Sequence, residues 1–132
     1  MNIYLDIDGV LITKDNKPAN FVTEFLKYIT ERHSVYWLTT HCRGGENRAL
    51  FHLQDKLLEE ATQYLYKIKS TDWSTLKTEA IDFTKDFIWF DDYILGVEKN
   101  ILIKNNVLDS FIEVNLKNNP KHLKEFLNKY NL

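Results

Sequence analysis

The sequence Ile3-Tyr4-Leu5-Asp6-Ile7-Asp8-Gly9-Val10 decides the fold, because it is a short apolar run that ends in two carboxylates and a glycine. Alternate residues of a strand share one face and each residue advances about 3.3 Å, so Asp6 and Asp8 project to one side roughly 6 to 7 Å apart. A phosphoryl group and a metal ion fit between them. Gly9 follows where the chain must turn, and glycine adopts left-handed backbone conformations without a steric penalty. An open α/β sheet presents a catalytic site in this way, at the carboxyl end of a strand.

Taken alone, the same string is also an ordinary turn signal, because aspartate and glycine are common in turns for purely conformational reasons. The remainder of the chain has to decide between a turn and a catalytic site.

Length and composition indicate one domain over residues 1–132, with room for one solid core and too little chain for two ordinary domains. The net charge is −2 with acidic and basic residues well mixed, so charge alone gives no case for a nucleic-acid or membrane surface. Cys42 is the single cysteine, which excludes an internal disulfide and favours a reducing compartment. The first strand begins at Asn2 and no apolar run reaches the length of a membrane span, so we expect a cytoplasmic protein.

Strand and helix signals alternate along the chain, which predicts βα units and a mainly parallel sheet. The expected strands are 2–7, 35–38, 64–68, 87–90 and 111–114, with 101–103 as a competitor for the last. The expected helices are 21–32, 46–61, a run after Ser74 that includes Ala80, Ile81 and Phe83, and a last one from Pro120. The predicted fold is α/β, a doubly wound three-layer Rossmann-like sandwich around a mainly parallel five-stranded sheet.

Polar residues follow three of these strands: Asp6 and Asp8, then Thr39, then Asp91 and Asp92. The carboxyl ends of parallel strands meet at one edge, so four carboxylates are expected in a single site. Two unit charges about 4 Å apart repel by roughly 4 kcal/mol at an effective dielectric near 20, so the cluster needs compensating charge or shared protons. Mg²⁺ fits this need, because it takes oxygen ligands and is commonly completed by substrate phosphate.

Lys77, expected in the first turn of a helix, adds a second positive group for phosphate oxygens, and Thr39 can donate a hydroxyl hydrogen bond to them. Lys85 competes with Lys77 for this role and Thr40 competes with Thr39. Whether Asp91 or Asp92 binds the metal directly stays open.

The roles of some neighbouring residues also stay open. His41 and Arg43 lie just beyond the threonines and either touch substrate or are simply solvated. Packing is the expected role of Cys42 and Trp73.

The order of these elements resembles the haloacid dehalogenase-like phosphatases. The resemblance rests on Asp6-Ile7-Asp8-Gly9-Val10, Trp37-Leu38-Thr39-Thr40, Lys77 and Trp89-Phe90-Asp91-Asp92, and spans residues 2 to 92. Each motif alone is weak, but all four occur in this order at strand or helix ends. Within that family the sequences of these motifs are most similar to those of the small domain of multi-domain RNA repair proteins.

The resemblance implies roles for the acidic pair. Asp6 would attack phosphorus and form an aspartyl-phosphate, which splits one difficult displacement into two easier ones. Asp8 would protonate the leaving oxygen and then activate water.

The resemblance also implies roles for the residues around this pair. Thr39 would hold the phosphoryl oxygens, Lys77 would neutralise charge, and substrate contacts would extend to Thr40 and Arg43. Asp91 and Asp92 would hold Mg²⁺ together with Asp6 and the backbone carbonyl of Asp8.

Many members of that family carry a cap domain, and neither of its usual insertion points has room for one here. The site is therefore expected to be open, which suits a phosphate on a large molecule such as a nucleic-acid end, or a nucleotide if another element covers it. Lys14, Lys17, Arg43 and Arg48 are candidates for a local basic rim.

Two other functional classes are less favoured. A phospho-accepting receiver domain also combines an acidic pair, a threonine and a lysine, but it accepts phosphate at the third strand, and the third strand expected here ends without an aspartate. A binding module that has lost catalysis is disfavoured because every catalytic position is filled.

Overall fold

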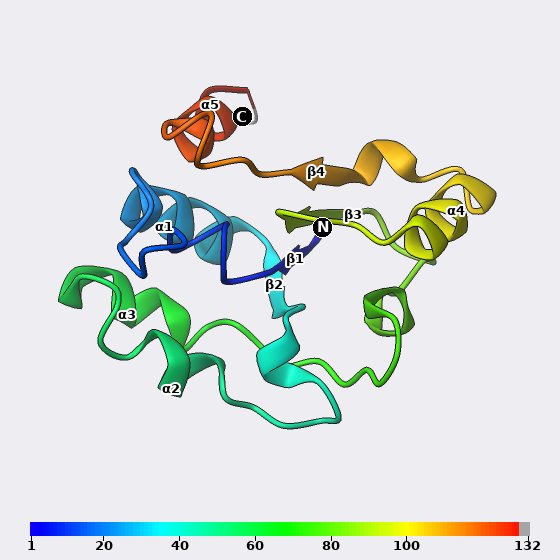
Figure 1. Ribbon diagram of the computed structural model, residues 1–132, viewed down its shortest axis with the longest axis horizontal. Helices are drawn as coiled ribbons and strands as arrows, with labels where there is room; N and C mark the ends of the chain where they lie inside the picture. Colours follow the sequence, from blue (N-terminus) through cyan, green and yellow to red (C-terminus); the bar gives the residue numbers. More distant parts are fainter. Residues whose placement is uncertain (130–132) are drawn as a thin grey trace.

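The computed structural model describes residues 1–129 and contains a parallel sheet of four strands in the order β2-β1-β3-β4. The strands are β1 (Asn2–Leu5), β2 (Ser34–Trp37), β3 (Phe87–Asp91) and β4 (Phe111–Glu113), and Figure 1 shows them stacked from β4 at the top to β2 below.

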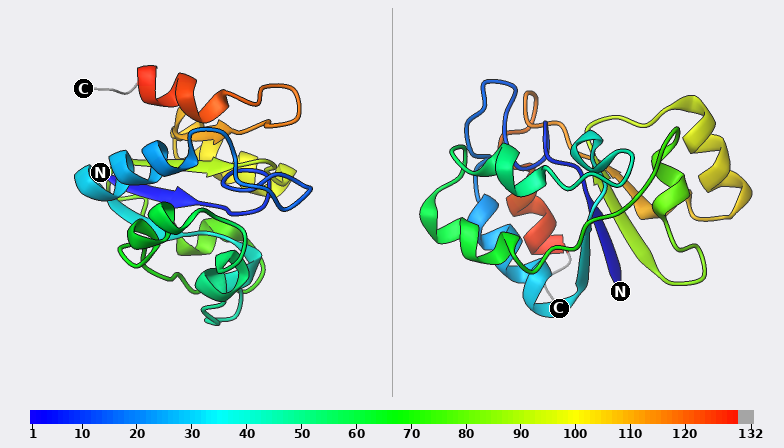
Figure 2. Two further views of the ribbon diagram at one scale, coloured as in Figure 1. Left: turned by 90° about the vertical axis from the view of Figure 1, so that its left-hand side faces the viewer. Right: turned by 90° about the horizontal axis from the view of Figure 1, so that it is seen from below.

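Helices cover both faces of this sheet. The α-helices are α1 (Val22–Arg32), α2 (Ala49–Leu53), α3 (Glu59–Leu65), α4 (Gly96–Lys104) and α5 (His122–Lys129). Three short 3-10 helices are η1 (Thr40–Cys42), η2 (Lys77–Ala80) and η3 (Leu108–Ser110). α1, α2, α3 and α5 lie on one side of the strands, with α4 and η2 on the other (Figure 2). The chain is thus a three-layer α/β sandwich of the Rossmann-like type.

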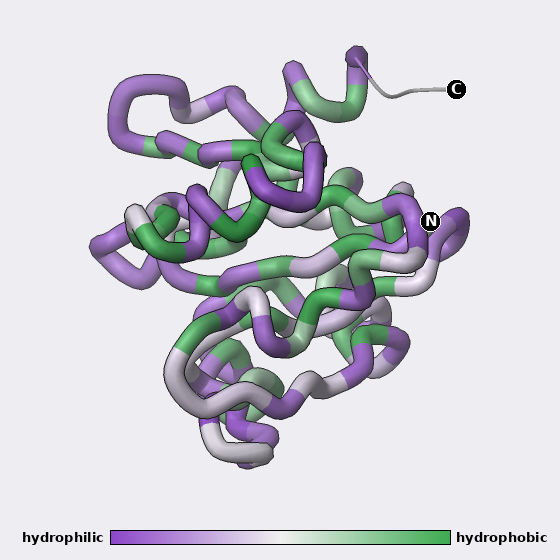
Figure 3. Tube along the Cα trace, turned by 90° about the vertical axis from the view of Figure 1, so that its right-hand side faces the viewer, coloured by the Kyte–Doolittle hydropathy of each residue, from purple (hydrophilic) through white to green (hydrophobic). Residues whose placement is uncertain are grey.

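The central strands are apolar along their whole length because both of their faces are covered, as parallel sheets require. Ile3 and Leu5 face the layer that contains α1, whereas Tyr4 faces the layer that contains α4. On β3, Phe90 faces the layer that contains α1 and Trp89 faces the layer that contains α4. Hydrophobic stretches run mainly through the interior of the fold, and many of the outer loops are hydrophilic (Figure 3).

Three aromatic rings hold α1 and α5 on the sheet. Phe25 of α1 meets Phe90 of β3 edge-on with ring centroids 5.2 Å apart, and Phe126 of α5 meets the same Phe90 at 4.3 Å. Edge-to-face pairs are favoured by the aromatic quadrupole beyond the area that they bury. These contacts fix α1 and α5 against β3.

The sheet has four strands in the described part of the chain, so the prediction of five was wrong. Residues 64–68 were expected to be the missing strand, but Tyr64 and Leu65 end α3, and only Lys69 forms an isolated parallel bridge, with Tyr36. A short apolar run does not distinguish a strand from a buried helical turn. The choice of 111–114 over 101–103 as the last strand was confirmed, since residues 101–103 belong to α4.

The single helix predicted at 46–61 is two short helices, α2 and α3, with a turn over residues 54–58. Both helices bury apolar residues, and the turn leaves Leu58 exposed. The helix predicted after Ser74 is only the 3-10 turn η2, whose N-cap is Leu76, so Ser74 is not its cap. The backbone N–H and hydroxyl of Ser74 instead donate to Glu79.

Residues 8–20 form a small folded loop in which Ile12 bridges both Asp8 and Pro18. Between β2 and β3, α3 packs against α1. Neither segment forms an additional layer above the carboxyl ends of the strands within residues 1–129 (Figure 1). None of the helices described is both long and apolar enough to cross a membrane.

Replacing Phe25 by alanine should lower the free energy of unfolding by about 3 to 5 kcal/mol, because it opens a cavity between α1, β3 and α5. Phe51→Ala is the matched control, since the Phe51 side chain is 80% exposed, and it should change stability by less than about 0.5 kcal/mol. Urea denaturation measures both variants. Equal losses in the two would contradict this account of the core.

Candidate active site

The pairing of β1 with β3 brings two buried carboxylates together at the carboxyl edge of the sheet. Leu5 is in register with Phe90, and the backbone N–H of Asp6 donates to the carbonyl of Phe90 at 3.0 Å. Asp6 and Asp91 are therefore neighbours, and both are buried. The chain passes from β1 to β2 on one side and β3 lies on the other, which makes this edge a topological switch point, where ligands bind in open α/β sheets.

Lys77, the first residue of η2, points its ammonium at this pair. Its Nζ lies 2.6 Å from Asp91 Oδ2 and 3.6 Å from Asp6 Oδ2. All three side chains are largely shielded from water, so this is a buried cluster of one positive and two negative groups. Lys85, the sequence competitor, is not part of the cluster.

Glu98, near the start of α4, holds the backbone of Lys77 in place. This carboxylate is buried at the start of α4 and accepts hydrogen bonds from the backbone N–H of Lys77 at 2.7 Å and of Leu95 at 3.1 Å. Glu79 organises the loop before η2 by accepting from the N–H groups of Thr75 and Leu76. The lysine therefore sits on a loop that two carboxylates fix at the backbone.

Burial and the neighbouring charge of Asp6 hold the pKa of Asp91 well above its ordinary value, with Lys77 only partly compensating. Burial acts to lower the pKa of Lys77, but the charges of Asp6 and Asp91 outweigh it, so the pKa is raised. The ammonium stays charged, and with both carboxylates ionised the pair would carry more negative charge than one lysine can balance. Such a pair favours uptake of a proton or of a cation.

Asp92 adds a third carboxylate. Asp6, Asp91 and Asp92 each offer an oxygen within 4.8 Å of the others, and the side chain of Asp92 is exposed. It approaches Gly9 so closely that a Cβ on Gly9 would lie 2.6 Å from Asp92 Oδ2. Gly9 also has φ +83°, so both conformation and space require glycine there.

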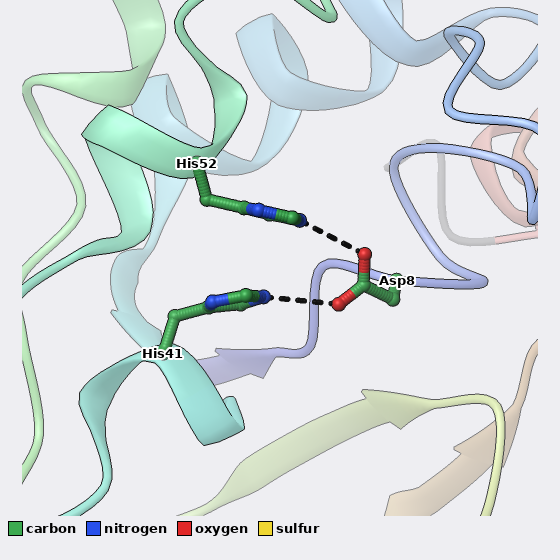
Figure 4. A group of neighbouring side chains, drawn as sticks. All are labelled: Asp8, His41 and His52. Carbon is green, nitrogen blue, oxygen red and sulfur yellow. Dashed lines mark hydrogen bonds and ion pairs between the residues drawn. The ribbon is translucent and has the colours of Figure 1, made fainter.

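Asp8 lies two residues beyond Asp6 and has different partners. Its two carboxylate oxygens are each 3.0 Å from the Nε2 atom of one histidine, His41 of η1 and His52 of α2 (Figure 4). Partial burial acts to raise the pKa of Asp8, but the hydrogen bonds from His41 and His52 outweigh it and lower the pKa. Asp8 is thus held as a carboxylate.

A cleft of about 390 Å³ opens onto these groups. Asp6, Asp8, Thr40, Arg43, Lys77, Asp91 and Asp92 are among the residues that line it. The structure therefore brings together all but one of the sequence-predicted site residues.

Thr39 is the exception. It is fully buried and does not line the cleft, and its hydroxyl accepts from the N–H of His41 at 3.4 Å as the cap of η1. Its competitor Thr40 is exposed on the cleft. The guanidinium of Arg43 donates to the carbonyl of Ser74 at 2.6 Å and lies over the Trp73 ring, so it is fixed at the rim.

Sequence reasoning missed Glu98 and His52. Neither belongs to a motif, and each reaches the site from a helix whose position depends on tertiary packing. Glu98 is the only acidic residue of α4, and the residues around it form no pattern that points to the site. His41 was considered as a substrate contact, and its partner in the structure is Asp8.

Comparison with protein-family models, with curated proteins and with solved structures finds no match to this chain.

With divalent cations removed by a chelator, the Asp91→Asn variant should become increasingly more stable than wild type as the pH rises. The raised pKa of Asp91 means that the folded state holds a proton that the unfolded state has lost, so wild-type stability falls with rising pH in this window. The slope is at most about 1.4 kcal/mol per pH unit, and asparagine removes it. Denaturant titrations between about pH 5 and about pH 8 measure the effect.

Asp92→Asn is the matched control, because it changes an exposed carboxylate of the same cluster and should leave the wild-type pH dependence in place. A stability difference between Asp91→Asn and wild type that is constant with pH would show that folding does not raise the pKa of Asp91.

Proposed function

We propose that this chain is a Mg²⁺-dependent phosphomonoester hydrolase of the haloacid dehalogenase-like type that forms an aspartyl-phosphate on Asp6. The observation that carries the proposal is the buried carboxylate of Asp6, 3.6 Å from Lys77 Nζ, at the carboxyl edge of a parallel sheet. Three of the four motifs behind the family resemblance contribute cleft-lining side chains there directly, and the threonine motif does so through Thr40. A buried free thiol at Cys42 is consistent with a reducing compartment, and we propose the cytoplasm.

The donor set fits the metal that this chemistry uses. Asp6, Asp91 and Asp92 would hold Mg²⁺, because hard divalent cations prefer carboxylate oxygens and these three offer no nitrogen or sulfur. When bound, Mg²⁺ supplies positive charge to the phosphate oxygens. It would also remove the imbalance between two buried carboxylates and one lysine.

The residues of the chain would carry out two displacements. In the first, a carboxylate oxygen of Asp6 bonds to phosphorus, the ester P–O bond breaks, and the leaving oxygen takes a proton from Asp8. In the second, Asp8 takes a proton from water, the water oxygen bonds to phosphorus, and the bond to Asp6 breaks. Lys77 balances charge on the phosphoryl oxygens.

Hydrogen bonding favours one half of this cycle. The two histidine contacts hold Asp8 as a carboxylate, which is the form that activates water. For the first displacement Asp8 must carry a proton, so one of these contacts has to be exchanged for the leaving group.

We further propose that the substrate is a phosphate on a large anionic molecule such as a nucleic-acid end. A second cleft of about 830 Å³ begins at Gly9 and Asp92 and is lined by three lysines, Lys14, Lys17 and Lys117, as well as by Asp15. It adjoins the candidate metal ligands and could guide a phosphate backbone toward them. Asp8 is exposed at the cleft of the candidate site, and no layer covers the carboxyl ends of the strands within residues 1–129, which supports the same substrate class.

Asp6→Asn should reduce phosphate release at least about a thousandfold, because the amide cannot act as the nucleophile. The assay follows hydrolysis of an aryl phosphate with and without Mg²⁺. Asp55→Asn is the matched control, since Asp55 is exposed outside the cleft and its variant should retain full activity. Equal activity in Asp6→Asn and wild type would rule out the mechanism.

The double variant Lys14→Glu/Lys17→Glu should raise KM for a phosphate-terminated oligonucleotide by about tenfold and flatten its salt dependence. Hydrolysis of an aryl phosphate should not change. Lys99→Glu/Lys104→Glu makes the same charge change on exposed positions of α4 and should leave both substrates unaffected. If only free mononucleotides are hydrolysed, the large-substrate proposal is wrong.

A further inference from the structure

Asp8, His41 and His52 form a second group of metal-ligating side chains beside the carboxylate cluster. They come from the loop after β1, from η1 and from α2, and their ligand atoms all lie within 4.8 Å of one another (Figure 4). We propose that this trio binds Zn²⁺ through a carboxylate oxygen of Asp8 and the Nε2 atoms of both histidines.

The ligand types match zinc. Zn²⁺ binds imidazole nitrogen and carboxylate oxygen at about 2.0 to 2.2 Å, so neighbouring ligand atoms of a tetrahedral site lie roughly 3.3 Å apart. Each Nε2 atom is now 3.0 Å from an oxygen of Asp8, close to that spacing. Coordination needs the imidazole hydrogen on Nδ1 instead of Nε2, a change of tautomer that costs the chain no rearrangement of its backbone.

The backbone holds the two rings in position before any ion binds. The N–H of Arg48 donates to the carbonyl of His41 at 3.1 Å, and the N–H of His52 donates to the carbonyl of Arg48 at 2.9 Å. The rings themselves are stacked, with centroids 3.8 Å apart and planes inclined by 22°. Both Nε2 atoms consequently face the same carboxylate.

The trio is also accessible. The side chains of His41 and His52 are 22% and 23% exposed and that of Asp8 is 53% exposed, so an ion can enter and water can fill a fourth position. Three protein ligands and one water is the common arrangement at accessible zinc sites. The neighbouring cluster of Asp6, Asp91 and Asp92 has only oxygens, so the two sites differ in metal preference.

Occupation of this site would remove Asp8 from proton transfer. Zn²⁺ should therefore inhibit Mg²⁺-supported phosphate release without displacing Mg²⁺. This consequence rests on the proposed function, whereas the binding itself does not.

The test is calorimetric titration of the full chain with Zn²⁺ in saturating Mg²⁺, with Co²⁺ absorption as a report on tetrahedral nitrogen coordination. Wild type should bind one Zn²⁺, and His41→Ala and His52→Ala should each weaken binding by at least about tenfold, because each removes one of three ligands. His52→Gln, which keeps a polar side chain of similar length, should weaken it equally, and thermal melts verify that each variant is folded.

Two further variants locate the ion. His122→Ala removes a histidine of α5 outside the cleft and should leave Zn²⁺ affinity unchanged. Asp91→Asn should also bind Zn²⁺ and give the Co²⁺ spectrum of wild type.

Absence of Zn²⁺ binding, or loss of binding in Asp91→Asn with retention in the His41 and His52 variants, would overturn the proposal. Histidine-dependent binding in a chain without phosphatase activity would support the zinc site and contradict the proposed function. Phosphatase activity in a chain that binds no Zn²⁺ would do the reverse.

Discussion

The parallel pairing of β1 with β3 is the constraint on which the candidate site depends. It places Asp6 beside Asp91 in the protein interior, where two carboxylates repel each other strongly. The arrangement persists because Lys77 approaches both and because the strands are locked by the apolar layers on either face. A stable core thereby supports a local excess of negative charge, which a proton or a cation can balance.

Lys77, which partly balances this charge, comes from a segment with little regular secondary structure. η2 is one turn of 3-10 helix, and its first residue is fixed by the buried carboxylate of Glu98. Glu98 also begins α4 by accepting from Leu95, so the same side chain sets the start of a helix and the position of Lys77. Helix packing on one face of the sheet and charge placement at its edge are therefore coupled.

Asp6 and Asp8 are two residues apart and occupy different electrostatic environments. Asp6 is buried with a lysine and a carboxylate, whereas Asp8 lies near the surface and accepts from two histidines. Groups whose surroundings differ in this way are suited to different tasks, and the proposed mechanism uses one as a nucleophile and the other in proton transfer. The group of Asp8, His41 and His52 offers nitrogen as well as oxygen atoms, whereas the group of Asp6, Asp91 and Asp92 offers oxygen atoms alone.

The sequence by itself determined the parallel α/β architecture and most of the candidate site, because apolar strands and the polar residues at their ends are local patterns. Asp6, Asp8, Lys77, Asp91 and Asp92 follow from those patterns and meet at one cleft. Tertiary structure alone decided that residues 64–68 add no fifth strand, that Thr40 and not Thr39 faces the cleft, and that Glu98 and His52 reach the site. These outcomes depend on how helices and loops pack across the sheet, and contacts between residues distant in the chain leave no periodicity in the sequence.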